Sequence, residues 1–386
     1  MRIVHVSVAG TPVLYRYGGA IQRRVIETAI AQAARGDDVV VYSPGETDGR
    51  QQYRGVEVRS VACKRAGRLG GIELQRRMVA DMEDEQLDIL HFHSQPEGAI
   101  LSRRIAAKKF LSYDYFLIRW GRKTPLYPLY RHFFGSFDAL LPVSQYCFDE
   151  SRRFWRIAPD SMRVLPNGVS TAQFRPDRAL QQAERQKLDI HKRVVLYVGR
   201  VCRQKGTDVL IDACKWLNER RDDIQLVVAG PIGQFGQTDD STEGWEVRIR
   251  RAGGIYLGPV AEERLCAIYN MADIFVMPTR TLEMFGMAAV EAQACGKPVI
   301  ASNHGGLVET VPDDCGARFP VGDARALATQ LAYFIDHQTA YERAAANALG
   351  NAARYDWERI VDQLAVIYRE TPAAPASRRL AEAMTM

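Results

Sequence analysis

Short apolar runs alternate along this chain with segments whose apolar residues recur at helical spacing. The first run is RIVHVSVA, and the amphipathic stretch IQRRVIETAIAQAAR follows it before a second run, DVVVYS. Runs that are apolar throughout predict strands buried on both faces, as in parallel sheets covered by helices on both sides. The order strand, loop, helix repeats, so the pattern predicts an α/β fold with doubly wound sheets.

The repeating pattern pauses once, in a stretch rich in turn formers and charge at residues 162–192, and restarts with the run RVVLYVGR. The pause predicts two Rossmann-like domains, over residues 1–175 and 176–356. A last amphipathic helix is expected at about 357–370, followed by a mobile tail at 371–386.

Composition agrees with a two-domain globular protein: the chain has 386 residues, of which 47% are hydrophobic and 25% charged. No apolar run approaches the ~18 to 20 residues that a membrane span requires, and the first residues read as a strand rather than a signal peptide. The seven cysteines are odd in number and form no C-x-x-C pair, which argues against a disulfide framework or a zinc site. A reducing cytoplasm is therefore the expected location.

Charge is concentrated in one segment. Between Ser102 and Phe137 there is a single acid, Asp114, and many aromatic residues. The bases in this segment are Arg103, Arg104, Lys108, Lys109, Arg119, Arg122, Lys123 and Arg131. Such a patch favours an anionic partner, either a phosphate-bearing substrate or an anionic membrane surface, although part of its aromatic content must be ordinary core.

Ligands of doubly wound sheets bind beyond the carboxyl ends of the strands, so polar residues that directly follow strands are the candidates for a site. Arg200 and Lys205 follow the strand in RVVLYVGR and precede a helix that starts near Thr207. Two cations beside the free amides of a helix start make an anion-binding site.

A second candidate is TLEMFGMAAVEAQACGKPVIAS, at residues 281–302. Phe285, Gly286 and Met287 are expected to form the first turn of a helix, with Glu283 in the loop before it and Glu291 two turns into it. Gly286 would let a ligand approach the free amides, while the two acids could hold hydroxyls on either side of a diphosphate, one on a sugar and the other on a ribose. Taken alone, Glu283 is more readily explained as a charge in the first turn of a helix, and Glu291 as part of a solvated helix face.

These motifs together resemble the retaining glycosyltransferases of family 4, which have the GT-B fold of two Rossmann-like domains facing a cleft. The resemblance rests on EMFGMAAVE, on GRVCRQKG, on the Gly pair after the first strand, on PNGV and on GPV before EERLCAIYNMAD, and it covers roughly residues 1–370.

The resemblance implies a role for each matching position in binding a nucleotide sugar. Arg200 and Lys205 would hold the donor diphosphate, Glu291 the ribose and Glu283 the transferred sugar. The remaining donor-binding positions implied in this way are Gly18, Gly19, Val260, Phe285, Gly286 and Met287. The family's C-terminal helix crosses back onto the N-terminal domain, which here is the expected acceptor-binding domain.

One departure from the family concerns the strand in FLSYDYF. Many members have a histidine at its end, where this chain places Asp114. Asp114 could replace it by hydrogen bonding to the sugar or acting as a base for the acceptor hydroxyl, or it could simply cap a turn. His93, at the end of DILHFHS, is either an acceptor-binding residue or a satisfied core histidine. With Arg119 and Arg122 these residues form the predicted acceptor site.

The predicted activity is therefore transfer of a sugar, with retained configuration, from a nucleoside diphosphate sugar to a hydroxyl of a saccharide, lipid-linked or small-molecule acceptor. The resemblance implies UDP as the nucleotide and a reaction without a metal ion, in which Arg, Lys and a helix dipole replace the cation. No cofactor and no nucleic-acid partner are expected. The acidic pair Asp239 and Asp240 lies in a Gly/Gln/Thr-rich stretch without other ligands, which favours a surface loop over a metal site. The alternatives are a GT-B epimerase or phosphorylase and a non-catalytic nucleotide-sugar-binding module.

Overall fold

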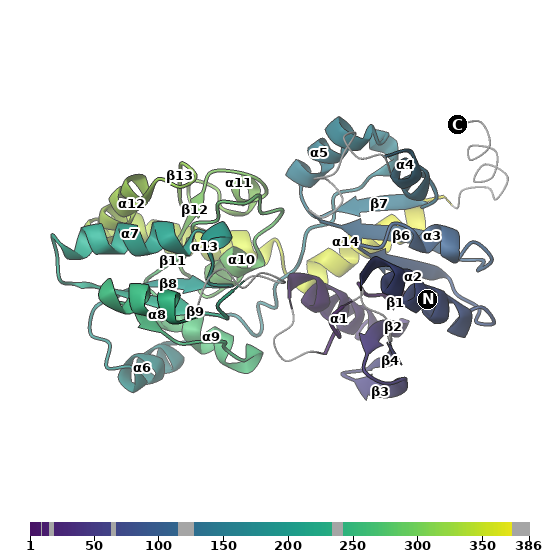
Figure 1. Cartoon of the computed structure of the whole chain (residues 1–386), viewed down its shortest axis with the longest axis horizontal. Helices are drawn as coiled ribbons and strands as arrows, with labels where there is room; N and C mark the ends of the chain where they lie inside the picture. The colour runs from purple at the N-terminus through teal and green to yellow at the C-terminus, as the bar shows by residue number, and fades with distance from the viewer. Residues whose placement is uncertain (9, 15–18, 63–66, 115–126, 234–241, 373–386) are drawn as a thin grey trace. The chain divides into compact units, whose positions relative to one another are not determined.

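The structure is a computed structural model that describes all of the chain except residues 9, 15–18, 63–66, 115–126, 234–241 and 373–386 (Figure 1). It contains two compact units, one of Met1–Asn167 with Trp357–Met386 and the other of Gly168–Asp356. The chain thus leaves the first unit slightly before the predicted boundary near residue 175 and returns to it at Trp357. Most of the predicted tail lies outside the described residues.

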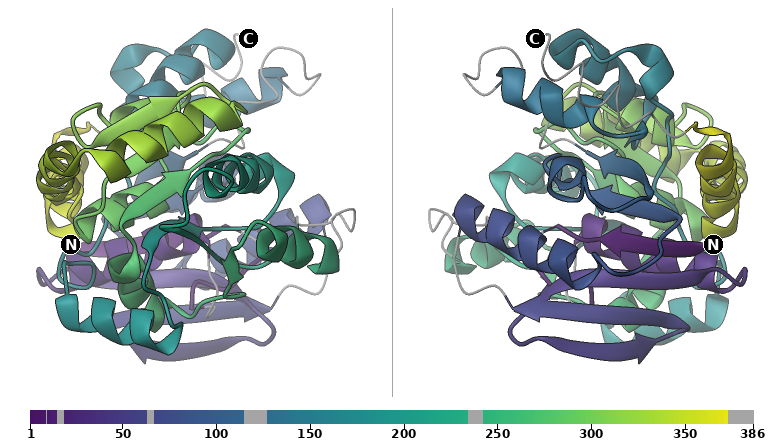
Figure 2. Two further views of the ribbon diagram at one scale, coloured as in Figure 1. Left: turned by 90° about the vertical axis from the view of Figure 1, so that its left-hand side faces the viewer. Right: turned by 90° about the vertical axis from the view of Figure 1, so that its right-hand side faces the viewer.

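The first unit is built on a seven-stranded sheet with the order β3-β4-β2-β1-β5-β6-β7. Its strands are β1 (Arg2–Val6), β2 (Asp38–Gly45), β3 (Gly49–Tyr53), β4 (Val56–Ala62), β5 (Ile89–His93), β6 (Lys108–Tyr113) and β7 (Ala139–Pro142). All neighbours pair in parallel except β3, which forms an antiparallel hairpin with β4 at one edge (Figure 2). All five residues of β3, GRQQY, are exposed, and they form the polar edge that this hairpin presents.

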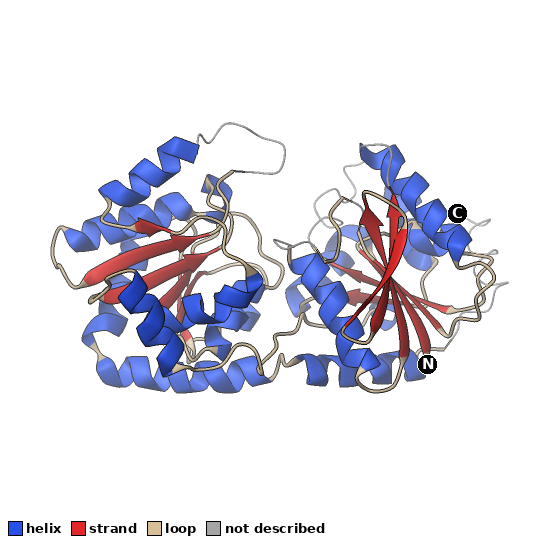
Figure 3. Cartoon of the chain, turned by 90° about the horizontal axis from the view of Figure 1, so that it is seen from below, coloured by secondary structure: helices blue, strands red, loops and turns tan. Residues whose placement is uncertain are grey.

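Helices of the first unit cover both faces of its sheet (Figure 3). They are α1 (Ala20–Ala33), α2 (Gly67–Asp81), α3 (Gly98–Leu101), α4 (Tyr127–Gly135), α5 (Gln145–Trp155) and α14 (Trp357–Glu370). Although α14 comes last in the chain, it packs on α1, and the Tyr368 ring lies 4.7 Å from that of Phe110. A long-range contact of this kind makes α14 part of the first unit's core.

The second unit has a six-stranded parallel sheet with the order β10-β9-β8-β11-β12-β13. Its strands are β8 (Arg193–Val198), β9 (Ile224–Ala229), β10 (Ile255–Tyr256), β11 (Ile274–Met277), β12 (Val299–Ser302) and β13 (Gly316–Phe319). Its helices are α6 (Arg178–Lys187), α7 (Thr207–Asn218), α8 (Thr242–Arg251), α9 (Glu262–Met271), α10 (Met287–Ala294), α11 (Leu307–Thr310), α12 (Ala324–Asp336) and α13 (Gln338–Ala353). The prediction of an α/β fold with two doubly wound sheets is confirmed.

Each sheet has one point where the strand order reverses. In the first unit this point lies between β1 and β5, and in the second between β8 and β11. Loops that leave such neighbouring strands turn to opposite faces and open a crevice at the carboxyl edge of the sheet, where ligands of this fold class bind. None of the described helices is long and apolar enough to span a lipid bilayer.

Candidate active site

The loops that follow β8 and β11 meet at the reversal point of the second sheet. There Lys205 Nζ lies 2.6 Å from Glu283 Oε2, and the two side chains are 25% and 21% exposed. The residues are far apart in sequence, yet β8 and β11 pair in parallel, so their carboxyl ends lie side by side. The structure therefore brings together one residue from each of the two predicted motifs.

Backbone hydrogen bonds hold these two loops together. The carbonyl of Gln204 accepts from the amides of Arg280 at 2.9 Å and Thr281 at 3.2 Å. The Arg280 guanidinium donates to the Asp208 carboxylate on α7 at 2.8 Å. Gly206, in the first loop, packs against Pro278 in the second so closely that a Cβ on Gly206 would lie 1.8 Å from the Pro278 carbonyl oxygen. Lys205 and Glu283 thus belong to two loops that are held together by hydrogen bonds, an ion pair and close packing.

A third loop, after β12, supports Glu283 from its other side. The Gly306 amide donates to the Glu283 carbonyl at 2.7 Å, and a Cβ on Gly305 would lie 2.4 Å from the same oxygen. Sequence reasoning missed this loop. The signal was available, since a Gly-Gly pair closely follows the predicted strand PVIAS.

The helix after Glu283 begins slightly later than predicted. Phe285 and Gly286 precede it, with Gly286 as its N-cap in the left-handed region (φ 89°), and Met287 is its first residue. The side chains of Phe285 and Met287 are buried, while the geometry of any helix start leaves the amides of its first turn without intrahelical partners. Gly286 is itself closely packed, since a Cβ there would lie 2.6 Å from Leu307 Cδ2, and the approach of a ligand to these amides stays a prediction.

Glu291 is buried inside the second unit, with only 3% of its surface exposed. The Tyr269 hydroxyl on α9 donates to Glu291 Oε2 at 2.7 Å. The alternative that Glu291 belongs to a solvated helix face is therefore wrong. A carboxyl group is costly to bury without partners, and Tyr269 supplies one of them.

The other predicted donor-binding residues lie near strand ends or outside the described chain. Arg200 follows β8 directly, is partly buried, and its carbonyl accepts from the Tyr197 hydroxyl at 2.6 Å. Val260 lies in the loop after β10, a strand separated from β8 by β9. Gly19 is the N-cap of α1 in the first unit, and Gly18 lies outside the described residues.

The predicted acceptor residues Asp114 and His93 line one small pocket of the first unit, at the reversal point of its sheet. Its other walls are Ala20, Ile21, Arg24, Ser94, Ser112, Tyr113 and Asn167. Burial lowers the pKa of Arg24 to about 10, and the nearby Asp114 opposes this effect. The structure thus places a buried cation beside Asp114. Arg119 and Arg122 lie outside the described residues.

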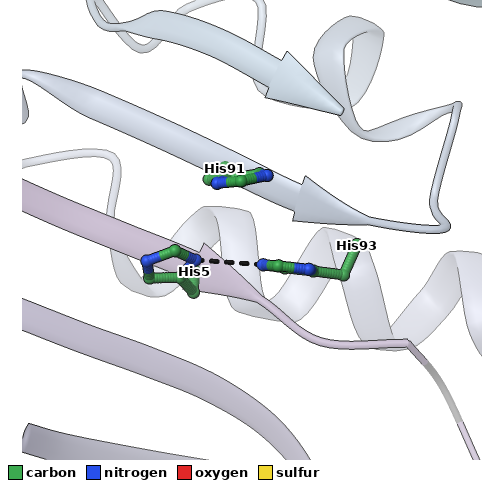
Figure 4. A group of neighbouring side chains, drawn as sticks. All are labelled: His5, His91 and His93. Atoms are coloured by element: carbon green, nitrogen blue, oxygen red, sulfur yellow. Dashed lines mark hydrogen bonds between the residues drawn. The ribbon is translucent and has the colours of Figure 1, made fainter. Parts of the chain in front are cut away.

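Three histidines, His5, His91 and His93, form a buried cluster (Figure 4). One of them, His93, also lines this pocket. His5 Nε2 lies 2.6 Å from Gln32 Oε1 and His5 Nδ1 lies 3.0 Å from His93 Nε2. Because the amide oxygen only accepts, His5 Nε2 carries the proton and His5 Nδ1 accepts from His93 Nε2–H. Among the described residues, His93 Nδ1 is then a buried acceptor without a hydrogen-bond partner.

Close spacing alone does not make this cluster a metal site. The rings of His91 and His93 are stacked, with centroids 4.4 Å apart and planes 17° apart. Nitrogen lone pairs lie in the ring plane, so those of stacked rings run side by side instead of converging on one ion. His91 also lies within hydrogen-bonding distance of Tyr368 at 2.6 Å and of Ser112 at 2.7 Å. The cluster is a hydrogen-bonded part of the core.

Comparison with known proteins agrees with this arrangement. The family model described as "Glycosyl transferases group 1" matches residues 181–351, and that described as "Glycosyltransferase Family 4" matches residues 17–173. The phosphatidyl-myo-inositol mannosyltransferase of Mycobacterium leprae is 27% identical over 391 residues, which cover 95% of this chain and 97% of that protein.

Another relative matches over a shorter stretch. The D-inositol 3-phosphate glycosyltransferase of Acidothermus cellulolyticus is 32% identical over 233 residues, or 58% of this chain, and the match spans only about half of that protein's length (52%). The solved structure of Anabaena HepE in complex with UDP and glucose superposes with a TM-score of 0.78 at 22% identity, over 96% of this chain and 99% of that one. The two family models match most of the chain, and each unit is built on a doubly wound α/β sheet. Together they show that the chain belongs to the group 1 glycosyltransferases and has the GT-B fold.

Proposed function

We propose that this protein is a retaining hexosyltransferase that moves a sugar from a nucleoside diphosphate sugar to a hydroxyl group. The observation that carries the proposal is the contact between Lys205 and Glu283 at the reversal point of the second sheet, next to Gly286 at the start of α10. A cation, a carboxylate and free amides in one place match a donor that combines a diphosphate with a sugar.

The reaction needs stabilisation of the negative charge that develops on the departing diphosphate. The Lys205 ammonium has three donors, so it can keep its bond to Glu283 and also reach a phosphate oxygen. Arg200 and the positive end of the α10 dipole would add to this field. With these groups in place the transfer requires no metal ion, and a chelator such as EDTA should leave the rate unchanged.

UDP is the proposed nucleotide, supported by the complexes of Anabaena HepE with UDP and with UDP-glucose. Glu291 would bind the ribose and Glu283 the sugar, with Val260 near the base and Gly18, Gly19 and the backbone of Phe285 and Met287 facing the phosphates and sugar.

The proposed acceptor is a polyhydroxylated molecule that carries a phosphate, free or lipid-linked. The names of the two relatives, which refer to D-inositol 3-phosphate and phosphatidyl-myo-inositol, support this class. In the pocket of the first unit, Asp114 would accept the proton of the attacking hydroxyl, with the buried Arg24 cation beside it. His93 Nδ1, which has no hydrogen-bond partner in the described part of the chain, could accept from a second hydroxyl.

A basic hollow at the end of α5 supports contact with an anionic membrane surface, which a lipid-linked acceptor would require. It is lined by Asp149, Arg152, Arg153, Arg156, Ile157, Ala158 and Pro159. On α4, whose Tyr127 stacks on Trp155 of α5, Leu129 is 43% exposed. Each basic residue near such a surface contributes about 1 kcal/mol of binding. Replacing Arg152, Arg153 and Arg156 with Ser should release the protein from phosphatidylglycerol vesicles at low salt without changing UDP affinity.

The deciding experiment has two stages. UDP, GDP and ADP are first titrated by calorimetry, and the matching nucleotide sugars are then incubated with inositol phosphate, with product and anomeric configuration determined by NMR. A transferred sugar with retained configuration supports the proposal. Binding without transfer or donor hydrolysis would indicate a non-catalytic module, and conversion of the sugar itself would indicate an epimerase.

Asp114→Asn tests the acceptor side. It should reduce transfer strongly while UDP affinity stays unchanged, whereas Asp160→Asn, at an exposed position in the same unit, should leave both unchanged. Full transfer activity in Asp114→Asn would return Asp114 to a turn-capping role.

A further inference from the structure

Two cysteine thiols lie against each other in the second unit, between α9 and the end of α10. Cys266 belongs to α9, and Cys295 is the C-cap of α10. The amide group of Asn270, one turn after Cys266, places its nitrogen 3.4 Å from Cys266 Sγ and 3.7 Å from Cys295 Sγ. The two sulfur atoms therefore share one polar environment.

The two thiols differ in access to solvent and in acidity. Cys266 is partly exposed, whereas Cys295 is buried, with 1% of its surface accessible. A hydrogen bond from the Cys295 thiol lowers the pKa of Cys266 to about 6. The Asn270 amide acts in the same direction, and burial opposes both. The same bond, together with burial, raises the pKa of Cys295. The lowered pKa favours the thiolate form of Cys266, the more accessible of the two residues, with the thiol of Cys295 behind it, as in redox-sensitive cysteine pairs.

We propose that Cys266 and Cys295 are a peroxide-sensitive modification site, in which Cys266 is oxidised first and Cys295 closes a disulfide between α9 and α10. The Cys266 sulfur attacks one peroxide oxygen and the O–O bond breaks, which yields a sulfenic acid and, after protonation, one water. The Cys295 sulfur then attacks the Cys266 sulfur, the S–O bond breaks, and the hydroxide leaves with the Cys295 proton as a second water. The two cysteines lose two electrons in total, and the hydroperoxide gains them.

The position of the pair connects it to the site described above. Tyr269, the neighbour of Asn270 on α9, donates to the buried Glu291, and Glu291 lies one turn before Cys295 on α10. Asn270 also fixes the segment that enters the second unit, because it donates to the Arg175 carbonyl at 2.9 Å and accepts from the Asp177 amide at 2.8 Å. A disulfide would draw the two sulfur atoms together, disturb the contacts that Asn270 makes with both of them and shift α9 against α10. The expected loss of UDP affinity rests on the proposed function, while disulfide formation does not.

The test uses the full chain, treated with hydrogen peroxide and digested with trypsin. Cys266 and Cys295 fall on different peptides, and because trypsin does not cut between Lys297 and Pro298, the Cys295 peptide also carries Cys315. We expect a linked pair of peptides in the parent and in Cys315→Ser, none in Cys266→Ser or Cys295→Ser, and reversal by dithiothreitol. In Cys295→Ser the sulfenic acid has no partner, so dimedone should label Cys266.

Each outcome bears on the proposal. Dimedone labelling of another cysteine in place of Cys266, or a link that persists in Cys266→Ser, would overturn it, as would direct passage of Cys266 to the sulfinic acid in the parent. UDP affinity is measured before and after oxidation, with an expected reversible loss of about fivefold or more. If the reduced protein binds no UDP, the proposed nucleotide site fails although the disulfide result stands. If the link forms and UDP affinity is unchanged, only the coupling between the two sites is wrong.

Discussion

Lys205 and Glu283 are each weak evidence for a binding site in the sequence, but in the structure they form one ion pair. A lysine after a strand and a glutamate before a helix are each common on protein surfaces. Their contact at 2.6 Å depends on the adjacency of β8 and β11 in the sheet. The chemistry proposed for the site depends on this pair more than on any other contact.

Lys205→Ala should therefore weaken UDP binding without unfolding the protein. The lost bond to a charged phosphate corresponds to roughly 1.5 to 3 kcal/mol, or about ten- to a hundredfold in Kd. Calorimetric titration with UDP measures the change. Arg203→Ala is the matched control, since Arg203 lies in the same loop with a side chain that is 79% exposed. Equal affinities for Lys205→Ala and the parent protein would disprove the assignment.

Tyr269 is a positioning residue for Glu291 that the sequence motif does not reveal. Removing its hydroxyl takes a donor away from a buried carboxyl group, so Tyr269→Phe should lower the free energy of unfolding by about 1 to 3 kcal/mol. If Glu291 also binds the ribose, the same variant should raise the Kd for UDP more than that for inorganic diphosphate. Urea unfolding and paired titrations measure the two effects, and a purely structural role would change only the first.

The start of α7 shows how the loops of the site constrain a helix. Gly206 is the N-cap of α7 with φ 72°, a left-handed conformation, and it packs against the Pro278 carbonyl. Thr207 and Asp208, the first residues of the helix, are held there by the loop that also carries Lys205. A glycine is required at this position for both conformation and space.

Gly206→Ala should destabilise the protein by about 1 to 3 kcal/mol through backbone strain alone, with the clash against Pro278 adding to it. Gly350→Ala provides the opposite control. Gly350 lies inside α13, and a Cβ there would meet no atom of the described residues within 4 Å apart from its own helix backbone and chain neighbours, so alanine should stabilise the protein by about 0.5 to 1 kcal/mol. The prediction would be contradicted if thermal unfolding showed the two variants to change stability in the same direction.

The buried histidines tie strands β1 and β5 to α14 and thus join the two ends of the chain in one core. His91 contacts Tyr368 of α14, and His5 contacts Gln32 of α1. Burial lowers the pKa of His5 to about 4. Burial also holds the pKa values of His91 and His93 well below their usual value. The neighbouring Arg24 cation acts on all three in the same direction. All three are therefore neutral in the folded protein at neutral pH.

Stability should fall as the pH is lowered below about 6.5, the pKa of an unperturbed histidine. Between that pH and the pKa of the histidine in the folded protein, the unfolded chain binds more protons. Each histidine therefore lowers the free energy of unfolding by up to about 1.4 kcal/mol per pH unit. His93→Gln keeps a donor toward His5 but does not titrate, and it should reduce this slope in urea unfolding between pH 5 and 7.5. His191→Gln, whose parent side chain is 85% exposed, should leave the slope unchanged. An unchanged slope in His93→Gln would show that His93 does not contribute.

Much of the fold could be predicted from the sequence, because most of the buried strands are apolar runs and most of the helices have an apolar face. The sequence predicts that the first turn of α10 includes Phe285, but the helix begins at Met287. Only the left-handed conformation of Gly286 shows that this residue precedes the helix. The supporting residues Tyr269, Arg280 and Gly306 were not found. Their partners lie on other strands and helices, and spacing along the chain carries no information about such pairs.

The sequence by itself determined the α/β class, the two sheets and the residues that follow each strand, because local hydrophobic periodicity specifies which segments are buried and how they are shaped. Only the tertiary structure decided that Lys205 contacts Glu283, that Glu291 is buried beside Tyr269, that α14 belongs to the first unit, and that Cys266 lies against Cys295. These contacts depend on strand order and helix packing. Both are set by the sum of many weak long-range interactions, which no single segment of the chain contains.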